Sequence, residues 1–198
     1  HVPERVSIDG FLRGRRYDGI NGTPQFFHFY ETATPEVLTS SAYLERLNNP
    51  TPWTQKIVPH IKDNNRTLSN VVNSVGHGVG AAILTARIAA DDKSESNFFN
   101  WVSGKLFPLL IKEPGIIAAH FLQGDKEASQ TETEEKALRE KPDQIADWII
   151  FIEAIEEEVL LKIWTDDYLS EKSLIQNGAS SANIGTYKLH FSLSSEDL

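Results

Sequence analysis

The stretch HVPERVSIDGFLRGRRY, His1 to Tyr17, decides the fold because its pattern returns later in the chain. In the first copy Pro3 stands seven positions before Gly10, and a strand-like run follows the glycine. In the second copy Pro108 stands seven positions before Gly115, and a strand-like run follows again. The offset is 105 both times (108 − 3 and 115 − 10). Each copy predicts the end of a helix, a glycine turn and a sheet strand.

The composition indicates a globular protein with an apolar core. The chain has 198 residues, 40% of them hydrophobic, and a formal net charge of −9. Nucleic acids and anionic membranes are bound through clustered Lys and Arg, so this acidic balance predicts neither as a partner. No apolar run approaches the roughly 18 residues of a membrane span, and nothing resembles a signal peptide. The absence of cysteine excludes disulfides and thiolate metal sites. We therefore expect a cytoplasmic protein.

The chain contains no methionine and opens in what reads as the last turns of a helix. Two explanations stay open together: selenomethionine positions omitted from the sequence, and an amino terminus that was cleaved or is disordered. Projecting the 105-residue offset backwards places a missing strand before His1. We expect about 25 to 30 further residues there, containing one apolar strand and one amphipathic helix.

The first part of the chain predicts a hairpin followed by helices and a strand. An alternating run from Phe11 to Tyr17 and an aromatic run from Gln25 to Thr32 flank a segment rich in turn formers, so the two strands should pair antiparallel. Thr34, followed by proline and glutamate, predicts a helix start. The pattern then predicts helical residues to Leu47, a helical segment over Trp53–Ile61 and a strand over Arg66–Val75.

The second part repeats this order with its beginning intact. The third strands of the two parts agree in detail, because Phe29-Tyr30-Glu31 matches Phe151-Ile152-Glu153 at an offset of 122. The pattern predicts strands over Ala82–Ala89, Ile116–Leu122, Asp147–Ile155 and Ile184–Leu193, and helices over Ser96–Ile111 and Glu156–Leu174.

The fold class that this order predicts is α+β, with two βαββαβ ferredoxin-like repeats whose antiparallel sheets pack into an α/β barrel. Residues 1–78 form the first repeat, which lacks its first strand and most of its first helix, and residues 79–198 form the second. The second repeat carries a polar insertion, residues 123–145, with a short helix signal. We favour a cover for a sheet edge, because exposed edges need protection; a lid over a cleft is the alternative.

The helix end His1-x-Pro3-Glu4, the turn from Gly10 into a strand ending in Arg16-Tyr17, and the aromatic strand after it resemble the EthD-like branch of the dimeric α/β barrel superfamily. The resemblance implies two four-stranded sheets packed into a barrel, here closed within one chain, with a homodimer compatible. It also implies a choice among cofactor-free monooxygenases, lactone isomerases, polyketide cyclases and dehydratases, and haem-handling proteins. The fold alone does not choose among them.

Four side chains of the predicted hairpin are candidate catalytic residues. Strand alternation gives His28 and Tyr30 a common face of their strand, and gives Arg15 and Tyr17 a common face of theirs. As one cluster they could polarise a carbonyl or phenolate, with arginine stabilising an enolate. The alternative is structural: aromatic strands usually form core, and a buried Arg15 would pair with an acid such as Glu31.

Further candidates come from outside the hairpin. His1 matches the motif histidine of the family, which implies a general acid or base, and a helix-end histidine that contacts terminal carbonyls is the alternative. Trp53 and His60 follow a broken helix that could admit a ligand, and Arg13 shares its strand face with Arg15. We predict Trp53, His60 and Arg13 as substrate-binding residues, with helix packing and surface exposure as the alternative for the first two.

The remaining histidines predict no metal site. His77 lies in a glycine-rich linker, and His120 has no acid or second histidine at ligand spacing. At the 105 offset His120 replaces Arg15 and Leu122 replaces Tyr17, so the second half is predicted to be a packing partner. We expect the site between the sheet and the helices of the first half.

The first functional hypothesis is a cofactor-free enzyme that performs acid–base chemistry on an aromatic, lactone or polyketide-like molecule. The second is a non-catalytic protein that carries a small hydrophobic or aromatic ligand or assembles oligomers. Haem binding is a third, from the resemblance and the histidines alone. No G-x-S-x-G signature of a serine nucleophile occurs, so covalent hydrolysis is disfavoured.

Overall fold

The computed structural model describes residues 1–198 except Thr23, 91–94 and 166–167, and its described strands form one seven-stranded sheet. The strands are β1 (Phe11–Asn21), β2 (Phe26–Thr32), β3 (Leu68–Gly76), β4 (Ala82–Ala90), β5 (Ile116–Asp125), β6 (Trp148–Ala154) and β7 (Ala179–Ser194). The helical segments are α1 (Val2–Val6), η1 (Pro35–Thr39), α2 (Ser41–Asn48), α3 (Pro52–Ile57), η2 (Val58–His60), α4 (Glu95–Trp101), η3 (Val102–Leu106), α5 (Phe107–Leu110), α6 (Lys126–Ser129), α7 (Glu134–Ala137), α8 (Glu157–Ile163), α9 (Glu171–Gln176) and η4 (Ser195–Asp197).

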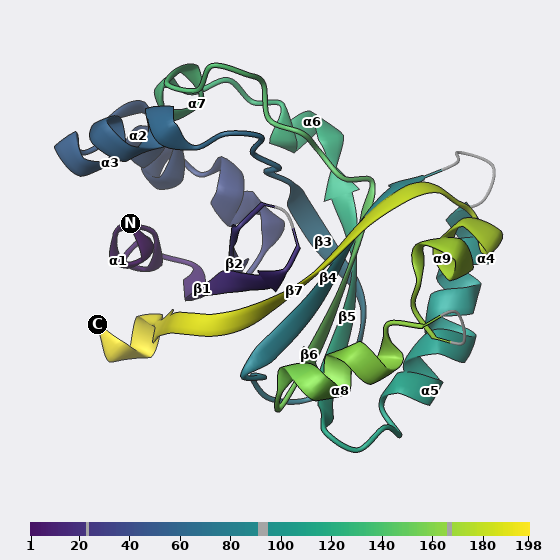
Figure 1. Ribbon diagram of the computed structural model, residues 1–198. Helices are drawn as coiled ribbons and strands as arrows, with labels where there is room; N and C mark the ends of the chain where they lie inside the picture. The colour runs from purple at the N-terminus through teal and green to yellow at the C-terminus, as the bar shows by residue number, and fades with distance from the viewer. Residues whose placement is uncertain (23, 91–94, 166–167) are drawn as a thin grey trace.

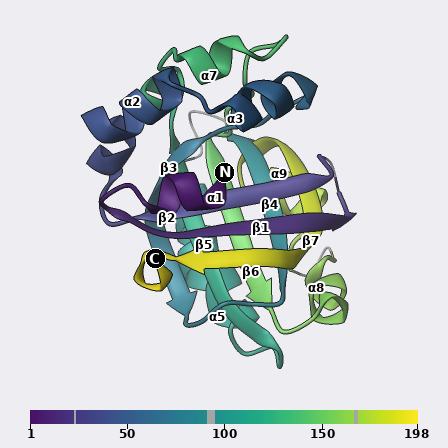
Figure 2. The ribbon, with the colours of Figure 1, turned by 90° about the vertical axis from the view of Figure 1, so that its left-hand side faces the viewer.

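The strand order is β2-β1-β7-β4-β6-β5-β3, and every neighbouring pair is antiparallel. The sheet curls, so that β1, β2 and β7 cross in front of β5 and β6 when viewed as in Figure 2. The long strand β7 joins the β1–β2 hairpin to the other three strands of residues 79–198. Both edges, β2 and β3, belong to residues 1–78.

The two glycine turns that the sequence predicts have the same local geometry. Gly10 and Gly115 both take positive φ angles, 89° and 94°, which residues with a Cβ rarely adopt. Each also lies against a valine: a Cβ on Gly10 would stand 2.5 Å from Val37 Cγ2, and one on Gly115 would stand 2.7 Å from Val159 Cγ2. The two valines are themselves 122 positions apart (159 − 37). The predicted turns are therefore confirmed at both places.

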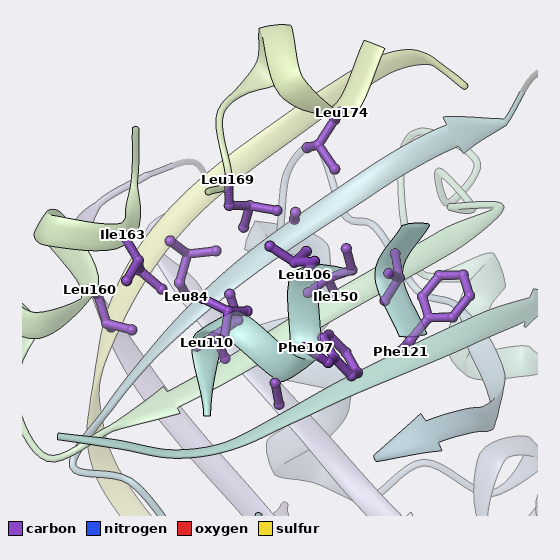
Figure 3. Packing of buried hydrophobic residues seen from close by; sticks show 14 of the residues in the cluster. Leu84, Leu106, Phe107, Leu110, Phe121, Ile150, Leu160, Ile163, Leu169 and Leu174 are labelled. Carbon is purple, nitrogen blue, oxygen red and sulfur yellow. The ribbon is translucent and has the colours of Figure 1, made fainter. Parts of the chain in front are cut away.

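The main core lies between the sheet and helices α4, α5, α8 and α9 (Figures 1 and 3). Strand β6 is buried along its whole length, which explains its apolar run from Trp148 to Ile152. Phe98 of α4 stacks on Trp148 of β6 with ring centroids 4.5 Å apart. Burying each large apolar side chain contributes about 1.5–3 kcal/mol, so this layer supplies much of the stability. We call the helix-covered face of the sheet the outer face.

The opposite face of the curled sheet, which we call the inner face, is lined mainly by aromatic rings. Tyr17 and Tyr187 are almost fully buried there, together with Phe151. Phe27 and Phe29 of β2 pack on Phe151 with ring centroids 5.4 and 5.1 Å away. The aromatic hairpin predicted from the sequence thus contributes to a second, smaller core.

Two predicted helices are interrupted. The helix expected from Thr34 to Leu47 breaks into η1 and α2, and Ser40 rather than Thr34 caps the α-helical part by accepting a hydrogen bond from the Tyr43 N–H. The helix expected over Glu156–Leu174 is two helices, α8 and α9, although residues 166–167 lie outside the described ones. Helical spacing continued across both breaks, so periodicity alone did not reveal them.

The insertion at residues 123–145 carries α6 and α7 and lies against residues 1–78. Its Ser129 hydroxyl accepts a hydrogen bond from the Leu68 N–H at the start of the edge strand β3, 2.8 Å away. Further along, the Arg66 N–H donates to the Gln144 carbonyl. Helix α7 lies beside α2 in both views (Figures 1 and 2). Among the described residues, no helix has the length and apolar character needed to cross a membrane.

Candidate functional site

The register of the hairpin divides the predicted catalytic cluster. Arg16, not Arg15, stands opposite His28 in the β1–β2 pair. Residues opposite each other share a face, and neighbours within a strand alternate between faces. Arg15 and Tyr17 therefore point to the inner face, whereas His28 and Tyr30 point to the outer face. The prediction that these four side chains form one group is wrong, and two separate polar groups take its place.

On the inner face, Arg15 holds two glutamates. Its Nη2 donates to Glu31 Oε1 at 2.7 Å, and its Nη1 donates to Glu153 Oε2 at 2.8 Å and to the Tyr17 hydroxyl at 3.2 Å. The guanidinium carbon lies 4.4 Å from the ring centroid of Phe29. The Arg15–Glu31 ion pair named as the structural alternative is present, and Glu153 of the second half extends it.

Glu153 connects this network to His120. Its side chain is fully buried, and its Oε2 also accepts a hydrogen bond from the Gly80 N–H at 2.7 Å. Its Oε1 has no hydrogen-bond partner among the described residues and lies 3.6 Å from His120 Nε2. Burial acts to raise the pKa of Glu153, but His120, Arg15 and Gly80 together hold that pKa below its ordinary value. The carboxylate is therefore ionised at neutral pH.

Tyr17 stays neutral beside these charges. Burial is the main reason that its pKa rises to about 12, and it outweighs the opposite effect of Arg15. The Tyr17 hydroxyl thus accepts the hydrogen bond from Arg15 without losing its own proton. Because the Arg15 donors are occupied by Glu31, Glu153 and Tyr17, this part of the network is closed.

The outer face of the hairpin carries the second group, which we call the outer-face cluster: His1, Arg5, His28, Tyr30 and Glu135. Arg5 of α1 is almost fully buried and forms an ion pair with Glu135 of α7. The His28 and Tyr30 rings meet edge to face, with centroids 6.0 Å apart. The insertion thus supplies one member of a group that otherwise comes from residues 1–78.

Several buried polar atoms in and beside the outer-face cluster have no hydrogen-bond partner within the described parts of the chain. They are His1 Nδ1, Glu4 Oε2, Arg5 Nη1, the Tyr30 hydroxyl and Arg139 Nε. An unpaired buried polar group costs about 1–3 kcal/mol, so such atoms are normally paired with water or with a ligand. Tyr30 also packs against the small apolar cluster of Phe11, Tyr43 and Leu47, so these polar atoms lie beside a packed core.

The ionisable side chains of this cluster include a neutral phenol and a neutral imidazole. Burial raises the pKa of Tyr30 well above its ordinary value, so the hydroxyl keeps its proton and can donate a hydrogen bond. Desolvation by the surrounding protein, and then Arg16, lower the pKa of His28 to about 4. The residue is nevertheless exposed on its strand, so the direction of this shift carries more weight than its size. His28 is therefore neutral at pH 7, with a free lone pair on one ring nitrogen.

The predicted substrate-binding residues are dispersed. Trp53 of α3 is 54% exposed, and its ring centroid lies 6.2 Å from that of His1. Arg13 lies on the inner face, opposite Glu31 in the register, and His60 is exposed at the end of η2. Of these three, Trp53 is the one beside the outer-face cluster. Within the part of the chain that the structure describes, no three His, Asp or Glu side chains are grouped to hold a metal ion.

Residues 79–198 also border a cavity of about 470 Å³, on the outer face between α4 and strands β3, β5 and β6. Its lining mixes aromatic and polar side chains, namely Val72, Glu95, Ser96, Phe99, Asn100, Phe121, Gln123 and Trp148. The Gln123 Nε2 donates to Glu95 Oε1 across it at 2.6 Å. The prediction of a pure packing partner did not anticipate this space.

Sequence reasoning missed two acids that organise these groups. Glu153 had a readable signal, because it is a charge in an otherwise apolar strand and matches Glu31 at the 122 offset. Glu135 had none, since its partner Arg5 lies 130 positions away and nothing in the pattern of the insertion connects the two. Pairings of this kind arise from tertiary structure.

Known proteins resemble this chain in structure rather than in sequence. No protein-family model and no curated protein matches it. An anthrone oxidase-like protein superposes with a TM-score of 0.67 at 14% identity, covering 98% of this chain and 84% of its own. Proposed monooxygenases from Lactobacillus acidophilus and Fusobacterium nucleatum subsp. nucleatum both have TM-scores of 0.52, at 11% and 8% identity, and cover 98% and 97% of this chain and 86% and 84% of their own.

These likenesses show the fold. This chain shares its curled antiparallel sheet and the helices packed on it with the anthrone oxidase-like protein. The dimeric α/β barrel superfamily and its EthD-like branch stay predictions.

Proposed function

We propose that the protein is a cofactor-free enzyme that performs acid–base chemistry on an aromatic, lactone or polyketide-like small molecule at the outer-face cluster. The observation that carries the proposal is the buried Tyr30 hydroxyl, which has no hydrogen-bond partner among the described residues. Leaving such a hydroxyl unpaired costs about 1–3 kcal/mol, and a polar ligand atom bound there recovers that free energy. The Tyr30 hydroxyl is thus available to donate a hydrogen bond to a ligand.

The neighbouring groups define roles. Neutral His28 is the proton acceptor, and Tyr30 and the unpartnered Nη1 of Arg5 are the donors to the oxygen on which negative charge develops. Glu135 holds Arg5 in position. We assign His1 and Trp53, whose ring centroids lie 6.2 Å apart, to contact with a flat ligand. Arg15 and Tyr17 have no part in this mechanism, because they point to the inner face.

The neighbour with a TM-score of 0.67 suggests the first probe. An anthrone is a fused-ring aromatic ketone, and loss of a ring CH₂ proton gives a planar aromatic enolate. Such an enolate needs a base on one side and donors at its oxygen, which are the groups that the outer-face cluster offers. The choice of an anthrone follows from the name of that neighbour, whereas the roles follow from the residues of this chain.

The test compares the parent with Tyr30→Phe in a thermal-shift screen against an anthrone, 2-naphthol and a lactone, followed by absorbance assays of turnover. Tyr187→Phe is the matched control, since it removes a buried hydroxyl from the inner face instead. We expect at least one probe to stabilise the parent and the control, and to bind Tyr30→Phe about 10-fold more weakly. Without a ligand, Tyr30→Phe should be no less stable than the parent, because it removes an unpaired polar atom.

Two results contradict the proposal. If Tyr30→Phe binds the probes as tightly as the parent does, the hydroxyl is not part of a ligand site. If probes bind at Tyr30 but none is converted, the non-catalytic carrier of a hydrophobic or aromatic ligand replaces the enzyme. Turnover that is lost in His28→Ala while binding is retained assigns the base.

We also propose that residues 1–78 and 79–198 are two ferredoxin-like repeats that together form one barrel. The order β7-β4-β6-β5 within the second part is that of a βαββαβ unit. The matched turns at Gly10 and Gly115 support equivalent positions in the first part. In this arrangement one strand position, between the edge strands β2 and β3, is filled by none of the described strands.

A further inference from the structure

We propose that Ser74, His120 and Glu153 form a second site, on the inner face, at which the Ser74 hydroxyl accepts an acyl group from an ester. The three residues come from the neighbouring strands β3, β5 and β6. No sequence motif connects them, and the absence of G-x-S-x-G disfavoured such chemistry. Nucleophile, base and acid are recognised by their geometry rather than by their order in the chain.

The geometry is that of a nucleophile, its base and the acid that orients the base. Ser74 Oγ lies 2.9 Å from His120 Nδ1, and His120 Nε2 lies 3.6 Å from Glu153 Oε1. The tautomer that suits both neighbours carries its proton on Nε2, toward the carboxylate. Nδ1 is then free to accept the proton of the Ser74 hydroxyl.

The orientation of Glu153 is fixed from behind. Its Oε2 accepts hydrogen bonds from the Gly80 N–H and from Arg15, which leaves Oε1 aimed at His120. That oxygen is buried and has no hydrogen-bond partner within the described residues. A fully buried carboxylate oxygen in this state stabilises the imidazolium that forms when His120 takes a proton.

Solvent reaches Ser74 and His120, whereas Glu153 is buried. Ser74 is exposed, the His120 side chain is 27% exposed, and the Glu153 side chain is 1% exposed. Strand β3 is also an edge of the sheet that the described strands form, and an edge strand directs alternate backbone N–H groups away from its one neighbour. Such groups are the usual donors to an oxyanion.

The reaction is a balanced acyl transfer. Ser74 Oγ forms a bond to the ester carbonyl carbon while His120 Nδ1 takes the hydroxyl proton. The bond from the carbonyl carbon to the leaving oxygen then breaks, and that oxygen receives the proton from His120. Water, activated by the same imidazole, later cleaves the acyl-serine and gives the carboxylic acid. No oxidant, reductant or metal ion takes part.

The test treats the protein with p-nitrophenyl acetate and, separately, with a fluorophosphonate that traps nucleophilic serines. Mass spectrometry of the intact protein and of its peptides locates the adduct. We expect one adduct, on Ser74, with release of p-nitrophenolate. Ser74→Ala should lose both signals, and His120→Gln should slow adduct formation by about 100-fold or more.

Ser180→Ala is the matched control, because Ser180 is an exposed serine whose hydroxyl contacts a backbone carbonyl instead of an imidazole. It should react as the parent does. An adduct absent from Ser74, or formed equally fast in a folded His120→Gln variant, overturns the proposal. The position of the adduct in the parent decides the matter even if a variant fails to fold. The outcome is independent of the outer-face cluster, since Tyr30→Phe should leave acylation of Ser74 unchanged.

Discussion

Residues 1–78 and 79–198 both consist of strands and helices, but they differ in where their strands lie in the sheet and in which side chains cover its outer face. In residues 79–198, four strands lie side by side and their outer face packs apolar side chains against α4, α5, α8 and α9 (Figure 3). In residues 1–78 the strands are at the two edges, and the outer face of the hairpin carries charged and unpartnered groups. The comparison teaches that one part stabilises the fold and so allows the other to keep a polar site.

On the inner face, both parts of the chain contribute polar groups. Arg15 and His120 are 105 positions apart, and Glu31 and Glu153 are 122 positions apart, so the two acid–base pairs occupy matched positions. They meet through the Arg15–Glu153 hydrogen bond of 2.8 Å. The first pair is closed and structural, whereas the second keeps a free carboxylate oxygen. If the proposed repeats are correct, their equivalent positions differ in accessibility as well as in residue type.

The largest difference between the matched acids should be seen on removing each one. Glu153→Ala removes the buried carboxylate that pairs with Arg15 and accepts from the Gly80 N–H, and we expect a loss of about 3–5 kcal/mol in the free energy of unfolding. Glu31→Ala removes a carboxylate whose side chain is 38% exposed, and water can replace it, so the loss should be about 1 kcal/mol or less. Urea denaturation of both variants measures this. Equal losses would mean that the two acids are equivalent.

The loss of stability at low pH should also depend on Glu153. The pKa of Glu153 is lower in the folded protein than its ordinary value of 4.5, so its contribution to stability is present above pH 4.5 and is lost as the pH falls through the lower folded value. We expect the parent to lose stability in this range more steeply than Glu153→Gln does. Urea midpoints measured from pH 7 to pH 3 provide the test. Parallel acid profiles would show that Glu153 is not held ionised by the fold.

The glycine turns test whether the two parts are equivalent. Gly10→Ala and Gly115→Ala both force a Cβ into a positive φ angle and against a valine, so each should cost about 1–3 kcal/mol. Gly104→Ala is the control, because a Cβ there meets nothing within 4 Å and alanine favours the helical conformation. Thermal unfolding reports all three. A large cost at one turn and none at the other would break the proposed correspondence between the repeats.

Local pattern was sufficient for most of the fold. The strands of both parts, the hairpin and the two glycine turns follow from alternation, apolar runs and turn residues, all of which depend on nearest neighbours in the chain. The helix interruptions did not follow, because apolar spacing continued through them. At Ser40 the backbone is extended, and that choice depends on the serine side chain and on packing rather than on periodicity.

Which side chains meet at the candidate site depends on the register between β1 and β2, and alternation within each strand does not determine that register. Alternation correctly grouped His28 with Tyr30, and Arg15 with Tyr17, within their own strands. Whether the two groups share a face is set by the register across the hairpin, and a shift of one residue reverses the answer. Glu153 and Glu135 enter through contacts between distant segments. Only three-dimensional structure supplies this information.

The smallest expected effects concern the serines that restart the two interrupted helices. The Ser170 hydroxyl accepts a hydrogen bond from the Ser173 N–H, and the Ser170 N–H donates in return to the Ser173 hydroxyl. The Ser40 hydroxyl accepts one hydrogen bond, from the Tyr43 N–H at 3.3 Å. We expect Ser170→Ala to cost about 1–2 kcal/mol and Ser40→Ala about 0.5–1 kcal/mol.

Thr34→Ala separates this reading from the cap that the sequence predicts. The Thr34 side chain makes no capping hydrogen bond, so its replacement should change the urea midpoint less than Ser40→Ala does. The reverse order would return the helix start to Thr34. Helix α9 carries Leu174 into the main core, whereas α2 carries Tyr43 and Leu47 into a smaller cluster. A larger loss of stability at Ser170 than at Ser40 would therefore also show that a helix cap contributes more where its helix packs on the larger core.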